Sequence, residues 1–272
     1  MIHLPNSMVK LKIQFLNYLD FFLNHNDSKL RKLTELKQNS NNYEEWMRKD
    51  WNLRAKHDPF YFVRSVKNQS EDDFWQSGYI DRDSILEKNS VQKILGKNFE
   101  NTSALEIGCG IGRILIPMSE KFHKVVGIDI SNEMIKVGKQ KTKKHPNCEF
   151  LVSNGKDLAD LPSGFFNFCY SFIVFQHIPD KDIIKNYMRD IHRVLKPNSC
   201  FCFQVKGIYE IDPIKFRLLD KINHEESHIH NTWFGVQFSS KEIHEIADEF
   251  GFKVIEESGE NTEYYWLTFL KK

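Results

Sequence analysis

Short runs of apolar and β-branched residues alternate with amphipathic segments from about residue 99 to residue 272. In the segments between the runs, apolar residues recur at helical spacing, most clearly between 183 and 191. Regular alternation of this kind predicts parallel strands joined by helices that cover both faces of the sheet. The pattern therefore predicts an α/β fold with a doubly wound, mostly parallel, seven-stranded sheet. The expected strands lie near 104–107, 124–129, 148–152, 165–171, 199–205, 252–257 and 263–270.

The last helix of this pattern has clear ends. Ser239 and Glu242 have the spacing of a capping box, and Gly251 is placed where a helix ends. Two closing strands follow it, and in this kind of fold the last strand usually runs antiparallel to its neighbours.

Residues 1–98 lack the alternation of strands and helices. Apolar residues at helical spacing predict a helix around residues 11–22, and a second helix is expected at 28–38. Aromatic residues are frequent between 46 and 79, and the simplest interpretation is that they pack this segment onto the sheet. We therefore expect a helical appendage or lid over residues 1–98 and an α/β domain over residues 99–272.

Composition narrows the class of protein. The formal net charge is +1, from 38 basic and 37 acidic residues, so the chain has no general attraction to nucleic acid. The five cysteines are scattered, which favours reduced, buried thiols over a disulfide framework. No run of about 18 apolar residues could span a membrane, and polar residues interrupt the N-terminal apolar segment. These observations predict a cytoplasmic protein.

The strand expected at 104–107 leads into a turn with glycines at positions 108, 110 and 112. Because glycine has no Cβ, a ligand can approach the bare backbone of such a turn at the start of a helix. A dinucleotide fingerprint is excluded, since its third glycine would fall on Arg113, and no P-loop lysine follows. Glu106 would repel a pyrophosphate but suits an ammonium group. The turn is therefore typical of a site for a small cationic nucleoside.

Acidic residues follow the next two strands. Asp129 comes 21 residues after Gly108, where a carboxylate can accept hydrogen bonds from both ribose hydroxyls of a nucleoside. The next predicted helix brings Met134 near the expected position of an adenine ring. Beyond the third strand, Asp157 is placed to accept a hydrogen bond from the adenine amino group, and Leu158 to pack on the ring.

Four motifs, in this order and spacing, resemble those of class I S-adenosylmethionine-dependent methyltransferases, of the branch that mostly modifies small molecules. They are Leu-Glu-Ile-Gly-Cys-Gly-Ile-Gly at 105–112, Val-Gly-Ile-Asp at 126–129, Asp-Leu-Ala-Asp-Leu-Pro at 157–162, and Phe-Gln-His-Ile-Pro-Asp at 175–180, followed by Val-Leu-Lys-Pro. The resemblance covers residues from about 99 to 272. It implies a Rossmann-like fold and S-adenosylmethionine as the methyl donor, with S-adenosylhomocysteine as the product and no metal.

Carried over to this sequence, the resemblance implies a set of cofactor-binding residues. Glu106 and the glycine turn would hold the methionine end, and the backbone near Phe172 its amino group. Asp129 would bind the ribose, Ile130 would pack against the adenosine, and Asp157 and Leu158 would take the adenine. The full set is Glu106, Gly108, Cys109, Gly110, Gly112, Asp129, Ile130, Met134, Asp157, Leu158 and Phe172. In related enzymes a segment before the first strand folds over the cofactor. Trp75 could then face the sulfonium, and Ser77 and Gly78 could touch the methionine carboxylate.

His177 follows the fourth strand by six residues, close to the expected position of the transferable methyl group. It is the candidate catalytic residue, either as a general base or as a donor that orients the acceptor. A purely structural histidine at the entry of a helix is the alternative. Gln176 beside it occupies a position that faces the pocket in similar enzymes.

Residues 207–238 form an insertion after the fifth strand, at the sheet edge where ligands bind in such folds, so it should roof the acceptor pocket. His224 and His228 in this insertion are candidates for contacting the acceptor, and a polar, solvated loop is the alternative. Their spacing of four would also suit a metal site on a helix, but no third ligand other than a nearby glutamate is apparent. We expect no metal.

The favoured function is methylation of an oxygen or nitrogen atom of a small molecule. A methyltransferase acting on protein or RNA is an alternative, which the near-neutral charge disfavours. A catalytically silent subunit that binds S-adenosylmethionine is another, and the acids at 106, 129 and 157 argue against it. We expect no nucleic-acid partner, and a homodimer through the N-terminal helices is a hypothesis.

Overall fold

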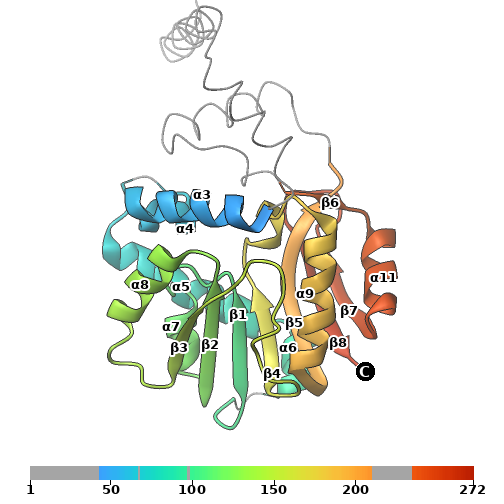
Figure 1. Cartoon of the computed structure of the whole chain (residues 1–272). Helices are drawn as coiled ribbons and strands as arrows, with labels where there is room; N and C mark the ends of the chain where they lie inside the picture. Colours follow the sequence, from blue (N-terminus) through green and yellow to red (C-terminus); the bar gives the residue numbers. More distant parts are fainter. Residues whose placement is uncertain (1–42, 67, 97–98, 210–234) are drawn as a thin grey trace, which may run out of the picture. The chain divides into compact units, whose positions relative to one another are not determined.

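The computed structural model describes residues 43–66, 68–96, 99–209 and 235–272 (Figure 1). Its strands have the order β3-β2-β1-β4-β5-β8-β7, with β6 paired to β5. They are β1 (Ser103–Ile107), β2 (Lys124–Asp129), β3 (Cys148–Val152), β4 (Phe166–Ser171), β5 (Leu195–Gly207), β6 (Gln237–Phe238), β7 (Phe252–Ser258) and β8 (Tyr265–Lys271). The helices are α3 (Tyr43–His57), α4 (Pro59–Arg64), α5 (Glu71–Leu86), α6 (Asn89–Leu95), α7 (Leu115–Ser119), α8 (Asn132–Lys141), η1 (Phe175–His177), α9 (Lys181–Val194) and α11 (Ser240–Glu249). The helices predicted at 11–22 and 28–38 lie outside the described residues.

The doubly wound, mostly parallel sheet expected from the sequence is confirmed. β1 lies between β2 and β4 and is parallel to both, and Glu106 at its end pairs with Gly127 and Tyr170. The four residues 104–107 of β1 are all buried, because helices cover both faces of a sheet built this way. The last strand, β8, is antiparallel to β5 and β7, as predicted.

Two details of the sheet were not predicted. The two-residue strand β6 lies within the 207–238 insertion and extends the sheet beyond the seven expected strands. β5 begins at Leu195, four residues before the predicted start, because Leu195 already pairs with Phe166. The next pair joins Cys200 to Phe168, so residues 196–199 form an irregularity in this ladder.

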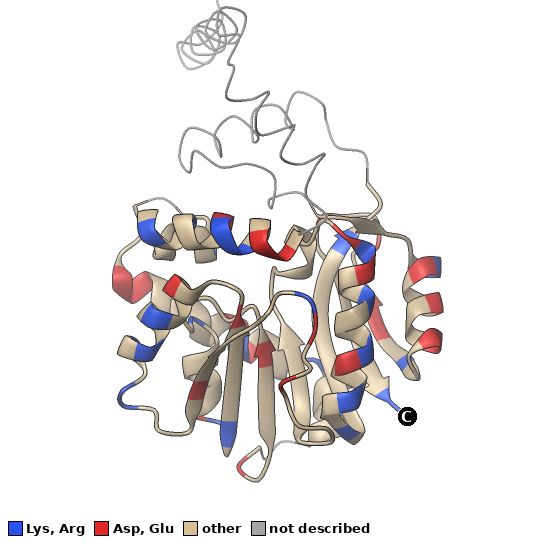
Figure 2. Cartoon of the chain, viewed as in Figure 1, with Lys and Arg blue, Asp and Glu red and all other residues tan. Residues whose placement is uncertain are grey.

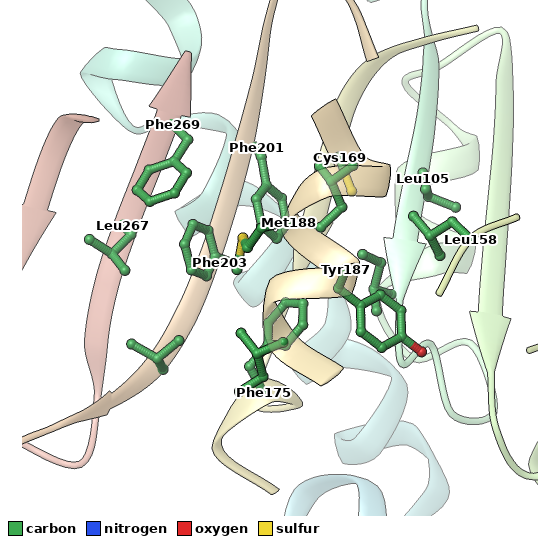
Figure 3. Packing of buried hydrophobic residues seen from close by; sticks show 14 of the residues in the cluster. Leu105, Leu158, Cys169, Phe175, Tyr187, Met188, Phe201, Phe203, Leu267 and Phe269 are labelled. Atoms are coloured by element: carbon green, nitrogen blue, oxygen red, sulfur yellow. The ribbon is translucent and has the colours of Figure 1, made fainter. Parts of the chain in front are cut away.

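The core lies on both faces of the sheet. On one face, α9 and α11 pack on inward-facing residues such as Phe201, Phe203 and Phe269 (Figure 3). On the other, α5, α6 and α7 pack on the alternate residues, which include Phe168 and Cys202. α11 has the predicted capping box, in which Ser239 Oγ accepts from the Glu242 N–H and the Glu242 carboxylate accepts from the Ser239 N–H.

Helix α3 lies across the carboxyl ends of β2 and β3 (Figure 1). The Arg48 guanidinium donates to the carbonyls of Ser153 and Asn154, 3.2 and 3.1 Å away, just after β3. Asn52 Oδ1 accepts from Ser131 Oγ at 2.8 Å, just after β2. These contacts fix α3 over the edge of the sheet where ligands bind in open α/β folds.

Acidic and basic residues are interspersed along α9 and α11 (Figure 2). They pair between the two helices, Lys181 with Glu242 and Lys185 with Glu249. Of the helices in the described ranges, none is both long and apolar enough to cross a membrane. The described residues belong to one compact unit, and the domain boundary near residue 98 stays a prediction.

Candidate functional site

A cavity of about 530 Å³ lies at the carboxyl ends of β1, β2 and β4. Its floor is the glycine turn after β1, and its roof includes Met47 and Trp51 of α3. Residues after β4 and from the β7–β8 connection line the remaining wall. This volume is in the range of small-molecule binding pockets.

The glycine turn is held close to its neighbours by its backbone. The N–H groups of Gly108 and Cys109 both donate to the Ile128 carbonyl, at 2.8 and 3.0 Å. Gly108 has φ +73°, and a Cβ there would lie 2.3 Å from Val174 Cγ2. Gly108 and Cys109 both line the cavity. The Gly108 backbone, which carries no side chain, therefore faces the space for a ligand, as expected from the sequence.

Gly110 also lines the cavity and donates to Asp129. Gly112 does not line the cavity. It lies against the side chains packed between α7 and β3, where a Cβ on Gly112 would be 2.5 Å from Phe150 Cζ.

The carboxylate of Asp129 lines the cavity at the end of β2. Its two oxygens accept from the backbone N–H groups of Gly110 and Ser131, each at 2.8 Å. Burial raises the pKa of Asp129 to about 6, while these N–H groups act in the opposite direction. The carboxylate is therefore ionised at neutral pH, and each oxygen keeps a lone pair for a ligand hydroxyl.

Glu106 is 3% exposed and accepts a hydrogen bond from Tyr170 Oη at 2.9 Å. Burial raises the pKa of Glu106 to about 8, although the Tyr170 hydrogen bond and the Arg113 charge both lower it. The side chain lines the cavity. Without a cationic ligand, most of this carboxyl is protonated at pH 7.

Arg113 was identified in the sequence only as the residue that breaks a dinucleotide fingerprint. It is buried, lines the cavity, and pairs with Asp81 of α5. Its guanidinium also lies 5.4 Å from the centre of the Phe172 ring, which lines the cavity too. The Arg113–Asp81 pair is part of the cavity wall.

The predicted adenine contacts divide into two groups. Ile130 and Met134 line the cavity. Asp157 and Leu158 do not: Asp157 accepts from Asn154 Nδ2 at 2.6 Å, and the Leu158 side chain is part of the hydrophobic core. From this loop, Ser153 and Gly155 line the cavity instead.

The three candidates on α5 are also away from the cavity. Trp75 packs edge-on against Phe60 and Phe74, and its Nε1 donates to Glu71. Ser77 Oγ accepts from Arg113, and a Cβ on Gly78 would lie 1.9 Å from the Arg113 carbonyl oxygen. The structure thus places Ser77 and Gly78 behind Arg113, so that α5 supports the cavity wall.

Gln176 and His177 lie in η1 and both line the cavity. The His177 ring is 7% exposed and meets the Trp51 ring edge-on, with centroids 5.6 Å apart. Ile173, Val174, Ile178, Glu263 and Tyr264 line this end of the cavity with them, whereas Phe175 is part of the core. His224 and His228 lie outside the described residues. Within the described part of the chain, no group of three or more His, Cys, Asp or Glu could hold a metal ion.

Sequence patterns missed several lining residues because they come from segments without a motif. They are Met47, Trp51, Phe62, Val63, Arg64, Ser65, Asp81, Ile173, Val174, Glu263 and Tyr264. A weak signal existed in the 46–79 segment, where Trp51 and Phe62 belong to the aromatic-rich stretch. Nothing in the sequence separates these two aromatics from Phe60 and Trp75, which pack away from the cavity.

Part of the chain is similar to known proteins. Residues 104–198 match a family model described as a methyltransferase domain. An uncharacterized protein of Methanocaldococcus jannaschii is 32% identical over 156 residues, which cover 56% of this chain and 52% of that protein. A demethylmenaquinone methyltransferase of Staphylococcus carnosus is 34% identical over 105 residues, covering 37% and 41% respectively. The chain spans about half the length of these curated relatives.

Solved structures show the same fold. The magnesium protoporphyrin IX methyltransferase of Synechocystis with bound SAH has a TM-score of 0.57 and 17% identity, and the match covers 83% of this chain and 98% of that one.

Proposed function

We infer that the chain, a class I S-adenosylmethionine-dependent methyltransferase by its matched domain and its fold, transfers a methyl group from S-adenosylmethionine to a small-molecule acceptor. The group methylated would be an oxygen or a nitrogen atom. The observation that carries this proposal is the Asp129 carboxylate, which lies beside the glycine turn with a lone pair left on each oxygen.

The residues around the cavity fit the three parts of the proposed cofactor. Asp129 suits two ribose hydroxyls. Ile130 and Met134 offer an apolar surface for the adenine. Glu106 suits the ammonium group, and the Gly108 backbone lines the cavity beside the space proposed for the methionine chain. Asp157 and Leu158 could reach the adenine only if the loop at 153–158 changed conformation.

When bound, the cofactor supplies a methyl group on a sulfonium, which is already a good leaving group. The protein then has to bind and orient the two reactants and to exclude water from the cavity. The glycine turn and Asp129 fix one reactant, while Met47 and Trp51 of α3 cover it. The acceptor enters from the side of His177, so that its nucleophilic atom, the methyl group and the sulfur can lie in line.

The acceptor end of the cavity combines apolar and polar groups. Phe172, Val174 and Tyr264 offer packing surface, and Gln176 and His177 offer hydrogen bonds. A small molecule with an apolar body and one polar group would suit this wall. His177 acts on that polar group, either as a base for a hydroxyl or as a donor that orients the acceptor.

Isothermal titration calorimetry tests the cofactor assignment. We expect S-adenosylhomocysteine to bind the full-length chain at one site and NAD to bind far more weakly. A preference for NAD would overturn the proposal. An enzymatic test is to incubate the protein with methyl-labelled S-adenosylmethionine and a panel of small hydroxyl- and amine-containing compounds.

A further inference from the structure

Gln204 is a fully buried polar residue near the carboxyl end of β5, with 0% of its surface exposed. Burying a primary amide is costly unless it makes hydrogen bonds. Its Nε2 atom makes two: one to the backbone carbonyl of Glu263 at 3.1 Å and one to Gln176 Oε1 at 2.7 Å. Gln204 therefore connects β5 to two segments that line the cavity.

The direction of these hydrogen bonds is fixed by the backbone carbonyl of Glu263. A carbonyl oxygen only accepts, so the Gln204 atom that contacts it is the amide nitrogen. That nitrogen has two hydrogens, and the second points to Gln176. The Gln176 atom that receives it must be Oε1, and the opposite end of the Gln176 amide is then the donor Nε2.

The Gln176 donor faces the imidazole of His177. The Gln176 Nε2 and His177 Nε2 atoms are 3.3 Å apart, between side chains that are 5% and 7% exposed. A donor on one side requires an acceptor on the other, so His177 Nε2 carries no proton in this arrangement. A neutral imidazole with a bare Nε2 has its proton on Nδ1.

The backbone of η1 is held in place independently of these side chains. The Gln176 carbonyl accepts from the Gly235 N–H at 2.8 Å, and the Ile178 carbonyl accepts from the Val236 N–H at 3.1 Å. The His177 N–H donates to the Val174 carbonyl at 2.9 Å. The two side chains therefore extend from a fixed backbone, and their relative orientation depends on Gln204.

We propose that Gln204 is a positioning residue, which acts through Gln176 to hold His177 as the neutral imidazole with its proton on Nδ1. The inference rests on the proposed function, in which His177 contacts the acceptor, and it distinguishes the two roles considered for this residue. A proton taken from the acceptor at Nε2 would face the Gln176 amide hydrogens, so a general-base role would require Gln176 to move away. In this arrangement the network therefore disfavours a general-base role for His177 at Nε2.

Nitrogen-15 NMR of the histidine rings measures the tautomer directly, because protonated and bare ring nitrogens differ widely in chemical shift. The chain has 11 histidines, so the spectrum of His177→Gln identifies the His177 signals by their loss. We expect wild-type His177 to show a bare Nε2 and a protonated Nδ1. The opposite tautomer would overturn the proposal, whether or not S-adenosylhomocysteine binds.

Two variants test the part played by the glutamines. In Gln176→Glu a carboxylate, which only accepts, replaces the donor, so we expect His177 Nε2 to become protonated. In Gln204→Met the orientation of Gln176 is released, so we expect the preference for one tautomer to weaken. Gln140→Met, on the exposed face of α8, is the matched control and should leave the His177 signals unchanged. An unaltered tautomer in Gln176→Glu would show that Gln176 does not control the His177 proton.

Calorimetry of S-adenosylhomocysteine binding to the wild type tests the proposed function separately. If S-adenosylhomocysteine does not bind but His177 has the expected tautomer, the proposed function fails and the hydrogen-bond network stands. Normal binding with the wrong tautomer would reject the inference alone.

Discussion

Replacement of Asp129 by alanine should weaken S-adenosylhomocysteine binding by about 100-fold or more. Each hydrogen bond to a charged group contributes roughly 1.5–3 kcal/mol, and the proposed complex has two of them, from the ribose hydroxyls. Such contributions are not fully additive, so we take a loss of about 3 kcal/mol. Since every 1.4 kcal/mol changes affinity about tenfold, this loss corresponds to roughly two orders of magnitude.

The same substitution also removes an acceptor from the protein itself. The N–H groups of Gly110 and Ser131 both donate to Asp129, and in Asp129→Ala they must turn to water in the cavity. Asp129→Asn is the finer variant, because it keeps one acceptor oxygen in nearly the same volume. Its NH₂ group, however, meets one of the two backbone donors. We expect Asp129→Asn to bind more tightly than Asp129→Ala and less tightly than the wild type.

Isothermal titration calorimetry at about pH 7.5 is the assay, because the pKa of Asp129 is raised to about 6 and the carboxylate is then ionised. Asp248→Ala, an exposed acid on α11, is the control for a lost negative charge. Thermal unfolding of each variant separates a lost contact from a damaged fold. An unchanged affinity in a folded Asp129→Ala protein would refute the role assigned to this carboxylate.

Three further outcomes are expected from the structure. The pKa of Glu106 is raised to about 8, and a bound ammonium would favour its ionised form. At about pH 7, S-adenosylhomocysteine binding should therefore release a proton, and its affinity should increase as the pH rises toward 8. Calorimetry in buffers of different ionisation enthalpy measures the proton release, and Glu106→Gln should abolish it. Gly108→Ala should weaken binding, and adding Val174→Ala should restore it only in part, because the clash is relieved but a left-handed backbone still costs about 1–2 kcal/mol. Phe203→Ala should lower the free energy of unfolding in urea by about 3–5 kcal/mol, since this fully buried ring stacks on its neighbour, and a loss below about 1 kcal/mol would contradict its place in the core.

The positions and the mostly parallel type of the strands could be predicted from the sequence because buried parallel strands need continuous apolar runs, and these are local patterns. β2 and β3 have the predicted ends, and the capping box of α11 lies at Ser239 as expected. The start of β5 at Leu195 could not be predicted, because it depends on pairing with Phe166 across the sheet. β6 has only two residues, too few for any periodic pattern.

The candidate site shows the same division between local and distant information. The glycine turn and Asp129 lie within 25 residues of each other in the sequence. Both belong to a local pattern of strand, turn and helix that can be found without knowledge of distant contacts. Trp51, Arg64 and Tyr264 reach the cavity from segments far from that motif, through tertiary contacts alone. Trp75 illustrates the opposite error: its position before the first strand suggested a ligand contact, but a neighbouring aromatic pair and Glu71 hold it elsewhere.

The residues missed by the sequence patterns are those most relevant to the choice of acceptor. The proposed cofactor end of the cavity is built from the ends of β1 and β2, which carry the motifs that the sequence shows. The proposed acceptor end is formed by η1 and by the β7–β8 connection, and the β7–β8 connection belongs to no motif. Gln204 links two of these segments from within the sheet, by hydrogen bonds to Gln176 and to the Glu263 carbonyl. We therefore expect a change at this single buried position to alter the orientation of Gln176 in the proposed acceptor wall while leaving the hydrogen bonds between Asp129 and the glycine turn in place.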